Sequence, residues 1–379
     1  MIYFIVRRSI FALILLVAVS FCTYVLFSAL PSDPAALTCG KNCTPEVIQR
    51  NRERLGYDKP LFTQYGQFVK GIFKGRTYGP DGADVHCDAP ALGYSFKRHQ
   101  CVTDLITRSL PVTISVSIGA FILWMLIGVG LGVFAALKRG RWPDRLATGF
   151  SVIGISLPTF FVGLLVILIF TIWWPIIDFP NYVGILKSPL SWAKALILPW
   201  ATLAVVSAST YVRLTRNGVI EVMNEEFVRL GLAKGVKRRV LIVKYVLRAA
   251  MVPIVTIAGL DFAALLGGAV ITESVFNLPG MGKLAIEAVV DSDLPILVAT
   301  TLVAAVFIVL ANAVVDFCYG FLDPRVRNRC PDNRCCRCAI CASRSTRRTA
   351  SSKRWTVFHS TCTPAKRSAS WARVVPESR

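Results

Sequence analysis

Six long apolar runs divide the chain, and polar segments separate them. The runs cover residues 10–30, 110–137, 147–174, 195–212, 251–271 and 295–321. A helix that crosses the hydrocarbon core of a bilayer needs roughly 20 consecutive apolar residues. Inside a membrane the backbone polar groups must also be satisfied within a helix or a closed barrel. The pattern therefore predicts an all-α integral membrane protein with six transmembrane helices.

The first run raises the alternative of a cleaved signal peptide. The apolar region of a signal peptide is about 7–15 residues long. This run extends over residues 10–30 and carries Tyr24 and Phe27 near its end. We therefore interpret it as a retained helix.

Composition and charge agree with the membrane prediction. The 379 residues are 54% hydrophobic and 17% charged, yet the net charge is +21. Much of this charge lies in the segment 328–379, where twelve Lys and Arg stand against two Asp and Glu. Most of the remainder lies in short segments between apolar runs, which is typical of cytoplasmic membrane loops and not of a nucleic-acid-binding face.

The basic residues also predict the orientation of the chain. They cluster before the first run, in the short segment 138–145, in the segment 213–248 and after the sixth run. Lys and Arg in short loops favour the cytoplasmic side. With six spans, all four segments fall on that side, so both termini are expected in the cytoplasm and the long loop 31–103 outside.

These features divide the chain into four parts. We expect a cytoplasmic N-terminus and first helix at 1–30, an extracytoplasmic loop at 31–103, a five-helix membrane core at 104–327 and a tail at 328–379. The tail contains a Cys335-x-x-Cys338-x-x-Cys341 motif, a spacing seen in zinc and iron–sulfur sites. It lacks a second Cys-x-x-Cys pair, so we expect no metal there and interpret the tail as a disordered basic segment or as sequence read beyond the true end.

Four further cysteines lie in the loop 31–103, where disulfides persist if the loop is outside the cytoplasm. They are Cys39, Cys43, Cys87 and Cys101. Four cysteines allow three pairings. Cys39–Cys43 with Cys87–Cys101 is the most local of these, and unpaired thiols are the alternative.

The segment 213–248 carries the most specific signal. Apolar residues recur at intervals of three and four through 221–234, which predicts a helix. Gly231 and Gly235 would let a neighbouring protein approach the backbone, and Gly235 can end the helix. The segment is interpreted as a docking helix, and a solvated amphipathic connector is the alternative.

Here the sequence resembles a known family. Residues 226–235 read EFVRLGLAKG, and Pro253 follows downstream. This stretch resembles the coupling loop of ABC-importer permeases, specifically the B-type subunit of the dipeptide, oligopeptide and nickel branch. The chain departs from the usual motif at Gly231, where Ala is common, and at Val252, where Leu is common. In a helix, Gly in place of Ala costs about 1 kcal/mol.

Further segments match the same family in the same order. They are PSDP at 31–34, LGYDKPL at 55–61, LGYS at 92–95, LGGAVITE at 266–273 followed by Val275-Phe276 and Pro279-Gly280, and DPR at 323–325. The resemblance covers most of residues 1–327 and implies the type I ABC-importer permease fold.

The resemblance also implies partners and a role. The chain has no G-x-x-x-x-G-K-[ST] phosphate loop, so ATP hydrolysis would belong to two partner ATPase subunits. A second permease, of the C type, and an extracytoplasmic solute-binding protein would complete the importer in a bacterial inner membrane. Contact with the ATPase is expected from a helix at about 221–235, through the residues Glu226, Arg229, Gly231, Ala233, Lys234 and Gly235.

Four polar residues lie within or near the apolar runs, where such groups are costly and become functional candidates. They are Asp261, Glu273, Asn312 and Asp316. We predict that they face a translocation pathway between subunits or pair with one another. Structural pairing, or a helix end shifted by a few residues, is the alternative, and it is favoured for Glu273 and Asp316.

The expected function is therefore passage of di- or oligopeptides, without enzymatic activity or a cofactor. Nickel or another small solute is an alternative cargo. A secondary transporter is an alternative class, but it would usually show inverted repeats, and none is evident. A membrane enzyme would need clustered catalytic residues, whereas His86, His99 and His359 are scattered outside the runs.

Overall fold

The chain is described from a computed structural model. The structure describes residues 2–28, 44–46, 48–49, 52, 60–78, 85–95 and 97–322. The chain divides into two compact units, 1–327 and 328–379, and every described residue belongs to the first. The predicted tail, together with Cys39 and Cys43, lies outside the described residues.

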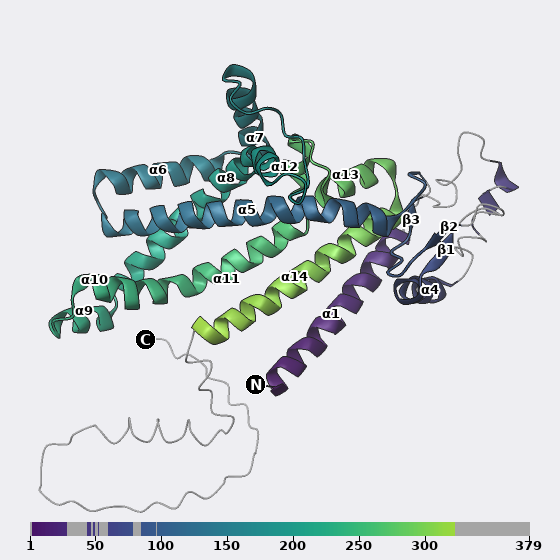
Figure 1. Cartoon of the computed structure of the whole chain (residues 1–379). Helices are drawn as coiled ribbons and strands as arrows, with labels where there is room; N and C mark the ends of the chain where they lie inside the picture. Colours follow the sequence, from purple (N-terminus) through teal and green to yellow (C-terminus); the bar gives the residue numbers. More distant parts are fainter. Residues whose placement is uncertain are drawn as a thin grey trace, which may run out of the picture. The chain divides into compact units, whose positions relative to one another are not determined.

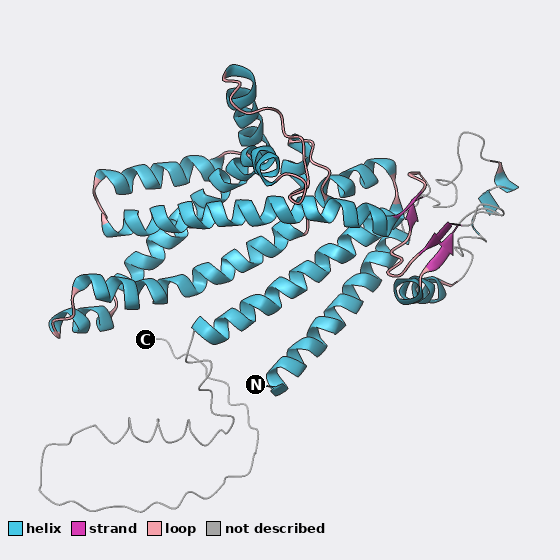
Figure 2. Ribbon diagram, in the orientation of Figure 1, coloured by secondary structure: helices cyan, strands magenta, loops and turns pink. Residues whose placement is uncertain are grey.

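Long helices dominate the described part of the chain (Figures 1 and 2). Five stretches are long and apolar enough to cross a membrane: α1 (Ile2–Ser28), α5 (Val102–Leu137), α8 (Pro189–Met223), α14 (Leu294–Leu322) and the stretch that ends with α11 (Leu247–Leu266). The last stretch begins at Arg238 and includes α10 (Arg238–Val240) and the π-helical turn η2 (Leu241–Val246). These spans agree with five of the six predicted apolar runs.

The third apolar run forms a bent pair of helices instead of one straight span. The segment α6 (Trp142–Ser156) is followed by α7 (Thr159–Ile167) and the π-helical turn η1 (Leu168–Trp173), at an angle of 103°. The prediction of one continuous helix over 147–174 is therefore wrong. Leu157 and Pro158 both have extended backbones, because the residue before a proline avoids the helical region and proline has no N–H to donate. Counted as one broken span, the pair brings the total to six.

The core of the bundle lies between α5 and α8. Small residues let the two helices approach closely: a Cβ on Gly128 would lie 2.6 Å from the Cβ of Tyr211, and one on Gly132 would lie 2.6 Å from that of Thr215. Trp124 and Tyr211 are fully buried in this contact. Close packing of small residues is a main source of helix association in lipid, so this pair forms the rigid centre of the unit.

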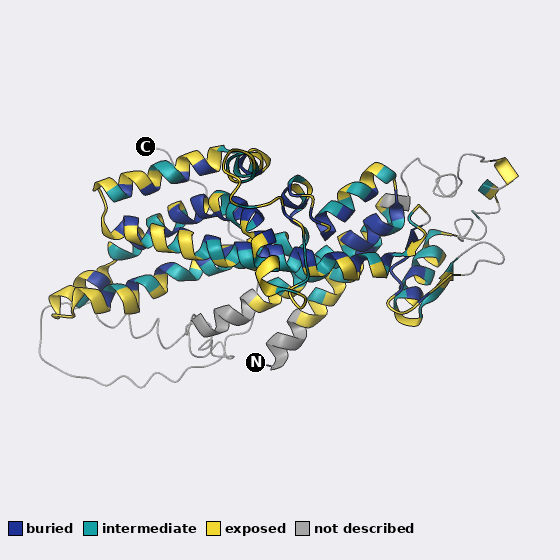
Figure 3. Ribbon diagram, turned by 45° about the horizontal axis from the view of Figure 1, so that its top comes forward, coloured by how far each residue is buried: buried dark blue, intermediate teal, exposed yellow. Residues whose placement is uncertain are grey.

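The outer helices are much less covered. In the bundle α14 contacts both α11 and α1, and most side chains of the apolar window of α1 remain outside the protein interior. Figure 3 shows extensive exposed surface on the long helices. These apolar surfaces are available to lipid or to another subunit.

Two small hairpins lie before α5. Strands β1 (Arg76–Tyr78) and β2 (Val85–Cys87) pair antiparallel, as do β3 (Tyr94–Ser95) and β4 (Gln100–Cys101). The helix α4 (Leu61–Lys74) precedes them. A disulfide joins Cys87 to Cys101 and so links the two hairpins at the N-terminus of α5.

Two short helices connect α11 to α14. They are α12 (Val270–Val275) and α13 (Met281–Asp291). The predicted fifth span, 251–271, ends too late, because the helix stops at Leu266 and Gly268 takes a φ of 131° that a helix cannot contain.

Candidate functional site

The α9 segment, defined here as residues 224–240, lies at the C-terminal end of α8. The helix α9 covers Glu226–Ala233. It does not continue α8, which ends at Met223. Glu225 has an extended backbone with ψ of 148° and separates the two helices. The predicted helix over 221–235 is therefore too long at its start, because residues 221–223 belong to α8.

Glycine ends α9 in a defined way. Gly235 has a φ of 77°, in the left-handed region that L side chains rarely adopt. Its N–H donates to the carbonyl of Leu232 at 3.0 Å, and the N–H of Val236 donates to the carbonyl of Gly231 at 3.1 Å. This pair of bonds is a Schellman motif, which satisfies the last carbonyls of a helix. The backbone here therefore depends on glycine at position 235.

The inner side of α9 is anchored in a small apolar core. Val228 is buried and packs with residues from the ends of the neighbouring helices, namely Ala136, Val219, Leu241, Val246 and Ala250. Gly231 lies against Leu241, since an added Cβ would be 2.8 Å from its Cδ1. The core draws on α5, α8, η2 and α11, so a force on α9 reaches four elements.

The outer side of α9 is exposed and mixed in character. Phe227 is 43% exposed and Leu230 is 61% exposed. Of the residues predicted for docking, Glu226, Arg229, Ala233, Lys234 and Gly235 are all exposed, and Gly231 is half-buried. Among the described residues, Glu226, Arg229 and Lys234 form no ion pair. Uncovered apolar and charged groups on a well-anchored helix are suited to contact with another protein.

A buried ion pair lies between the start of α6 and α8. The Nε and Nη2 atoms of Arg216 donate to the two carboxylate oxygens of Asp144, with Nη2 at 3.0 Å from Oδ2, and the N–H of Gly140 donates to Oδ2 at 2.8 Å. The Asp144 side chain is 7% exposed. The bidentate geometry fixes the α5–α6 turn to α8. This pair was not predicted from the sequence, although Asp144 is the only acid among the four basic residues of 138–145.

Asp261 lies on α11 and is exposed in this chain. Its Oδ2 accepts a hydrogen bond from the hydroxyl of Tyr211 on α8 at 2.6 Å. The ring of Tyr211 stacks on Trp124 of α5, with centroids 6.2 Å apart. Asp261 is therefore held by a buried aromatic residue, and among the described side chains neither Glu273 nor Asn312 forms a hydrogen bond with it.

Glu273 has a structural environment. It is fully buried on α12. Its carboxylate accepts from the Thr113 hydroxyl at 2.7 Å and from the N–H groups of Gly282 and Lys283 at 2.7 and 3.1 Å. It thus accepts hydrogen bonds from backbone N–H groups in the first turn of α13, which have no partner within that helix. Through Thr113 it also links α13 to α5. Burial raises the pKa of the Glu273 carboxyl, and these hydrogen bonds oppose the rise.

The remaining two predicted pathway residues both lie on α14. Asn312 is half-buried on α14, and Asp316 lies in the last part of α14, where side chains are not described. Among the described side chains, Asp261, Glu273 and Asn312 make no hydrogen bond to one another. The three of these residues whose side chains are described therefore form no hydrogen-bonded cluster.

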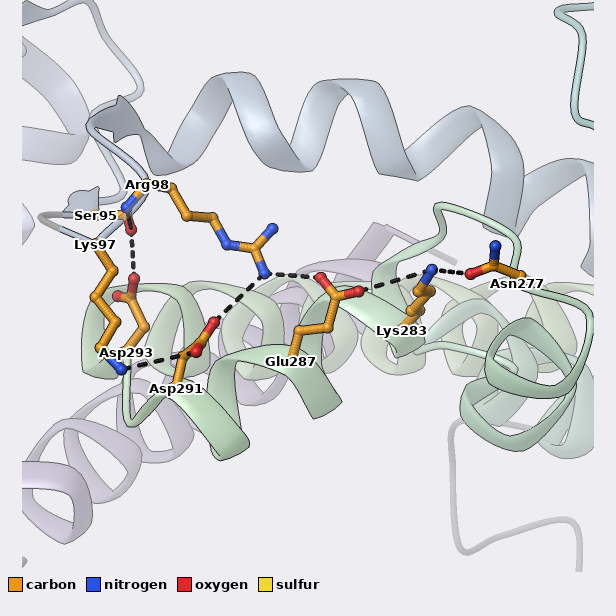
Figure 4. Close-up of polar contacts among 8 residues, drawn as sticks. All are labelled: Ser95, Lys97, Arg98, Asn277, Lys283, Glu287, Asp291 and Asp293. Atoms are coloured by element: carbon orange, nitrogen blue, oxygen red, sulfur yellow. Dashed lines mark hydrogen bonds and ion pairs between the residues drawn. The ribbon is translucent and has the colours of Figure 1, made fainter.

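A polar network holds the second hairpin on α13 (Figure 4). Arg98 donates to Glu287 at 2.7 Å and lies 3.9 Å from Asp291, and Lys97 lies 3.7 Å from Asp291. Ser95 donates to Asp293, which is buried. Burial raises the pKa of the Asp293 carboxyl, although the bond from Ser95 opposes this. The network sits at the N-terminal end of α5, whereas α9 packs near its C-terminal end.

Up to six potential spans, small-residue packing between them and a short, anchored helix with an exposed side at one end of the bundle define a multi-pass membrane protein. The chain belongs to the family of binding-protein-dependent transport system inner membrane components: the family model matches residues 128–328, and the model of the family's N-terminal membrane component matches residues 1–117. It has the type I ABC-importer permease fold of that family and is a permease subunit of the inner membrane. In general, such permeases work with an ATPase, another permease and a binding protein.

Relatives of similar length support this assignment. A protein of Brucella abortus (strain 2308), named as a candidate peptide transport system permease, is 35% identical over 326 residues, which cover 85% of this chain and 98% of the relative. The glutathione transport system permease GsiC of Escherichia coli (strain K12) is 32% identical over 330 residues, which cover 86% of this chain and 99% of GsiC.

Proposed function

We propose that this permease carries di- or oligopeptides in an ATP-driven importer and that α9 couples it to an ATPase subunit. The observation that carries the coupling role is the two-sided character of α9. Its inner side is anchored through Val228, while Phe227, Leu230 and Arg229 are exposed on the remainder of the helix. The names of the relatives support peptides as cargo.

The anchoring suggests how movement would pass from the ATPase to the pathway. The helix is short and closed by its Schellman motif, so it moves as one body. Its buried core joins the ends of α5, α8 and α11, and the Asp144–Arg216 pair adds the start of α6. A shift of α9 would therefore bias the packing of the helices between inward-open and outward-open arrangements.

The same proposal fixes the orientation and the partners. The excess of Lys and Arg in 138–145 and 213–248 favours the cytoplasmic side for α9, with both termini on that side. Two ATPase subunits would lie below the membrane. A second permease of the C type would complete the pathway.

The opposite end is the proposed docking face for the extracytoplasmic binding protein. The β3–β4 hairpin is fixed on α13 by the polar network, and the disulfide joins it to the first hairpin. Beside it, α13 exposes Val289 at 63% and Val290 at 80%. Exposed apolar side chains beside a rigid network of charged residues are suited to reversible contact with another protein.

The coupling role is tested by Gly235→Arg in the complete importer. The substitution forces a bulky side chain into a left-handed backbone position and adds a charge beside α9. ATP-driven uptake of a peptide pool into proteoliposomes should fall at least about tenfold, at normal abundance in the membrane. Gly235→Asn should keep most activity, because Asn tolerates this conformation.

The matched control is Gly140→Arg. Gly140 also has a positive φ, 79°, with open space around it, and it lies in the α5–α6 turn. Gly140→Arg should retain most uptake. Uptake by Gly235→Arg at the normal rate would contradict the coupling role, whereas uptake by the purified wild-type chain alone, without ATP, would favour a secondary transporter.

A further inference from the structure

The open face of α11 carries an unusual charge. Exposed residues on α11 include Pro253, Ile257, Leu260, Asp261 and Ala264. Their spacing of four, three, one and three residues places them along one side of a helix. The other described helices leave that side uncovered, and Asp261 lies within a stretch long and apolar enough to cross a membrane.

A carboxylate at this position is costly if it faces lipid. Ionisable residues inside membrane helices almost always face a water-filled cavity or a partner group. Asp261 has one such partner, since Tyr211 donates to its Oδ2 at 2.6 Å. No hydrogen bond or ion pair to Oδ1 is found among the described residues. The uncovered side of α11 therefore faces a pathway or another subunit and not the bilayer.

The surroundings of Asp261 hold it in place. Tyr211 is fully buried and stacks on Trp124. Phe262, the next residue on α11, packs against Phe121 with ring centroids 4.8 Å apart. A carboxylate beside an aromatic ring, here that of Tyr211, is a common setting for an organic cation, because both groups attract positive charge.

We infer that Asp261, oriented by Tyr211, binds a positively charged amine of the cargo as it passes along α11. The inference rests on the proposed function, because a peptide with a free N-terminus or a Lys side chain supplies such a group. A fixed Arg or Lys of the second permease has the same chemistry, and the experiment below separates these two sources.

The first test measures the site without any cargo. Ala264 is exposed on α11, about one helical turn from Asp261. In the assembled importer, Ala264→Cys is treated with a cationic or an anionic thiosulfonate of equal size, and modification of that position is followed by mass spectrometry. With Asp261 present, the cationic reagent should react about five- to tenfold faster than the anionic one. Adding Asp261→Asn should bring the two rates close together.

Other outcomes of this test overturn the inference. Protection from both reagents would mean that a subunit covers the face. Equal rates with Asp261 in place would mean that its charge is already neutralised by a fixed partner.

Tyr211→Phe should keep the charge preference but reduce it, because the carboxylate loses its orientation and not its charge.

The second test uses transport. Proteoliposomes with the complete importer receive a pool of peptides, half of them N-acetylated, and imported peptides are identified by mass spectrometry. The wild type should prefer free amines by about tenfold, and Asp261→Asn should lose that preference while retaining ATP-driven uptake. Unchanged preference would overturn the inference and leave the proposed function intact, whereas no ATP-driven uptake of any peptide by the wild type would overturn the proposed function itself.

Discussion

The two ends of α5 differ in where their side chains find partners. At the N-terminal end, Arg98, Glu273 and Asp293 bond to residues elsewhere in the same chain. At the C-terminal end, Arg229 and Lys234 of the α9 segment have no ion-pair partner in the part of the chain that the structure describes. The polar groups named at the first end are paired within the fold, whereas Arg229 and Lys234 at the other end are exposed.

The two ends of α5 also differ in how far apart in the sequence their hydrogen-bonded partners lie. Glu273 bonds to Thr113 across 160 residues, and Ser95 to Asp293 across 198. The C-terminus of α9 is instead closed by bonds between residues three to five positions apart. A locally closed helix keeps its own shape without long-range hydrogen bonds, as the proposed coupling role requires.

The largest expected loss of stability comes from removing Glu273 near the N-terminal end of α5. Glu273→Ala removes a buried acceptor and leaves the Thr113 hydroxyl and two backbone N–H groups without it. The free energy of unfolding should fall by about 3 kcal/mol or more. Thermal unfolding of the purified permease in mild detergent measures this loss.

Glu273→Gln is the matched control, because its amide keeps the shape and one acceptor oxygen, and it should cost much less. The Gln variant also tests how the stability of the permease depends on pH. The buried Glu273 carboxyl has a raised pKa, so the folded chain holds this proton to higher pH than the unfolded chain. Its contribution to stability is present below the ordinary carboxyl pKa and is lost as pH rises through the folded pKa. The Gln variant should lack that decrease, and an identical pH profile in both proteins would refute the assignment.

A smaller loss of stability is expected from breaking a long-range ion pair in the same half of the bundle as α9. Removing either partner of the buried pair Asp144–Arg216 should cost about 2–3 kcal/mol. The double variant Asp144→Ala/Arg216→Ala should cost less than the sum of the two, because neither charge is then left unpaired. A double-mutant cycle on the thermal unfolding of the permease gives the coupling energy.

The exposed pair Lys97–Asp291 provides the comparison for this cycle. Its atoms are 3.7 Å apart and both side chains are 43% exposed. Water and salt screen such pairs, so its coupling energy should be below about 1 kcal/mol. Equal coupling in the two cycles would show that burial of Asp144 does not strengthen its bond to Arg216.

The sequence was sufficient for features that depend on composition or on neighbouring residues. Bilayer thickness sets the length of apolar runs, so the spans could be located, and Gly235 could be assigned to the end of α9. The bend at Leu157–Pro158 was harder to predict. Proline also occurs inside the continuous helices α5, α8 and α11, because surrounding groups can compensate for the lost hydrogen bond.

Features that depend on distant partners could not be predicted. Asp144 and Arg216 are 72 residues apart, and no local pattern connects them. Glu273 was a pathway candidate for which structural pairing was favoured, but its actual partners, Thr113 and the N–H groups of α13, could not be identified from the sequence. Asp261 was singled out by its position in a span, but Tyr211 as its partner required the packing of α8 on α11.

The smallest predicted effect concerns the stability of α9 itself. Gly231→Ala removes the helix penalty of glycine, about 1 kcal/mol. The added Cβ would lie 2.8 Å from Cδ1 of Leu241, the far end of a flexible side chain, and moving it costs about 0.5 kcal/mol. The net gain should be small, so amide exchange in α9 should slow about two- to threefold with unchanged global stability.

Gly235→Ala makes the same chemical change four residues later and should have the opposite sign. Position 235 has a φ of 77° and open space around its Cα, so the added methyl meets no neighbour and the whole cost is backbone strain, about 1 kcal/mol. Amide exchange in α9 should therefore become about fivefold faster. If both variants changed exchange in the same direction, the stability of α9 would not be set by its local closure, and the contrast between the two ends of α5 would lose its physical basis.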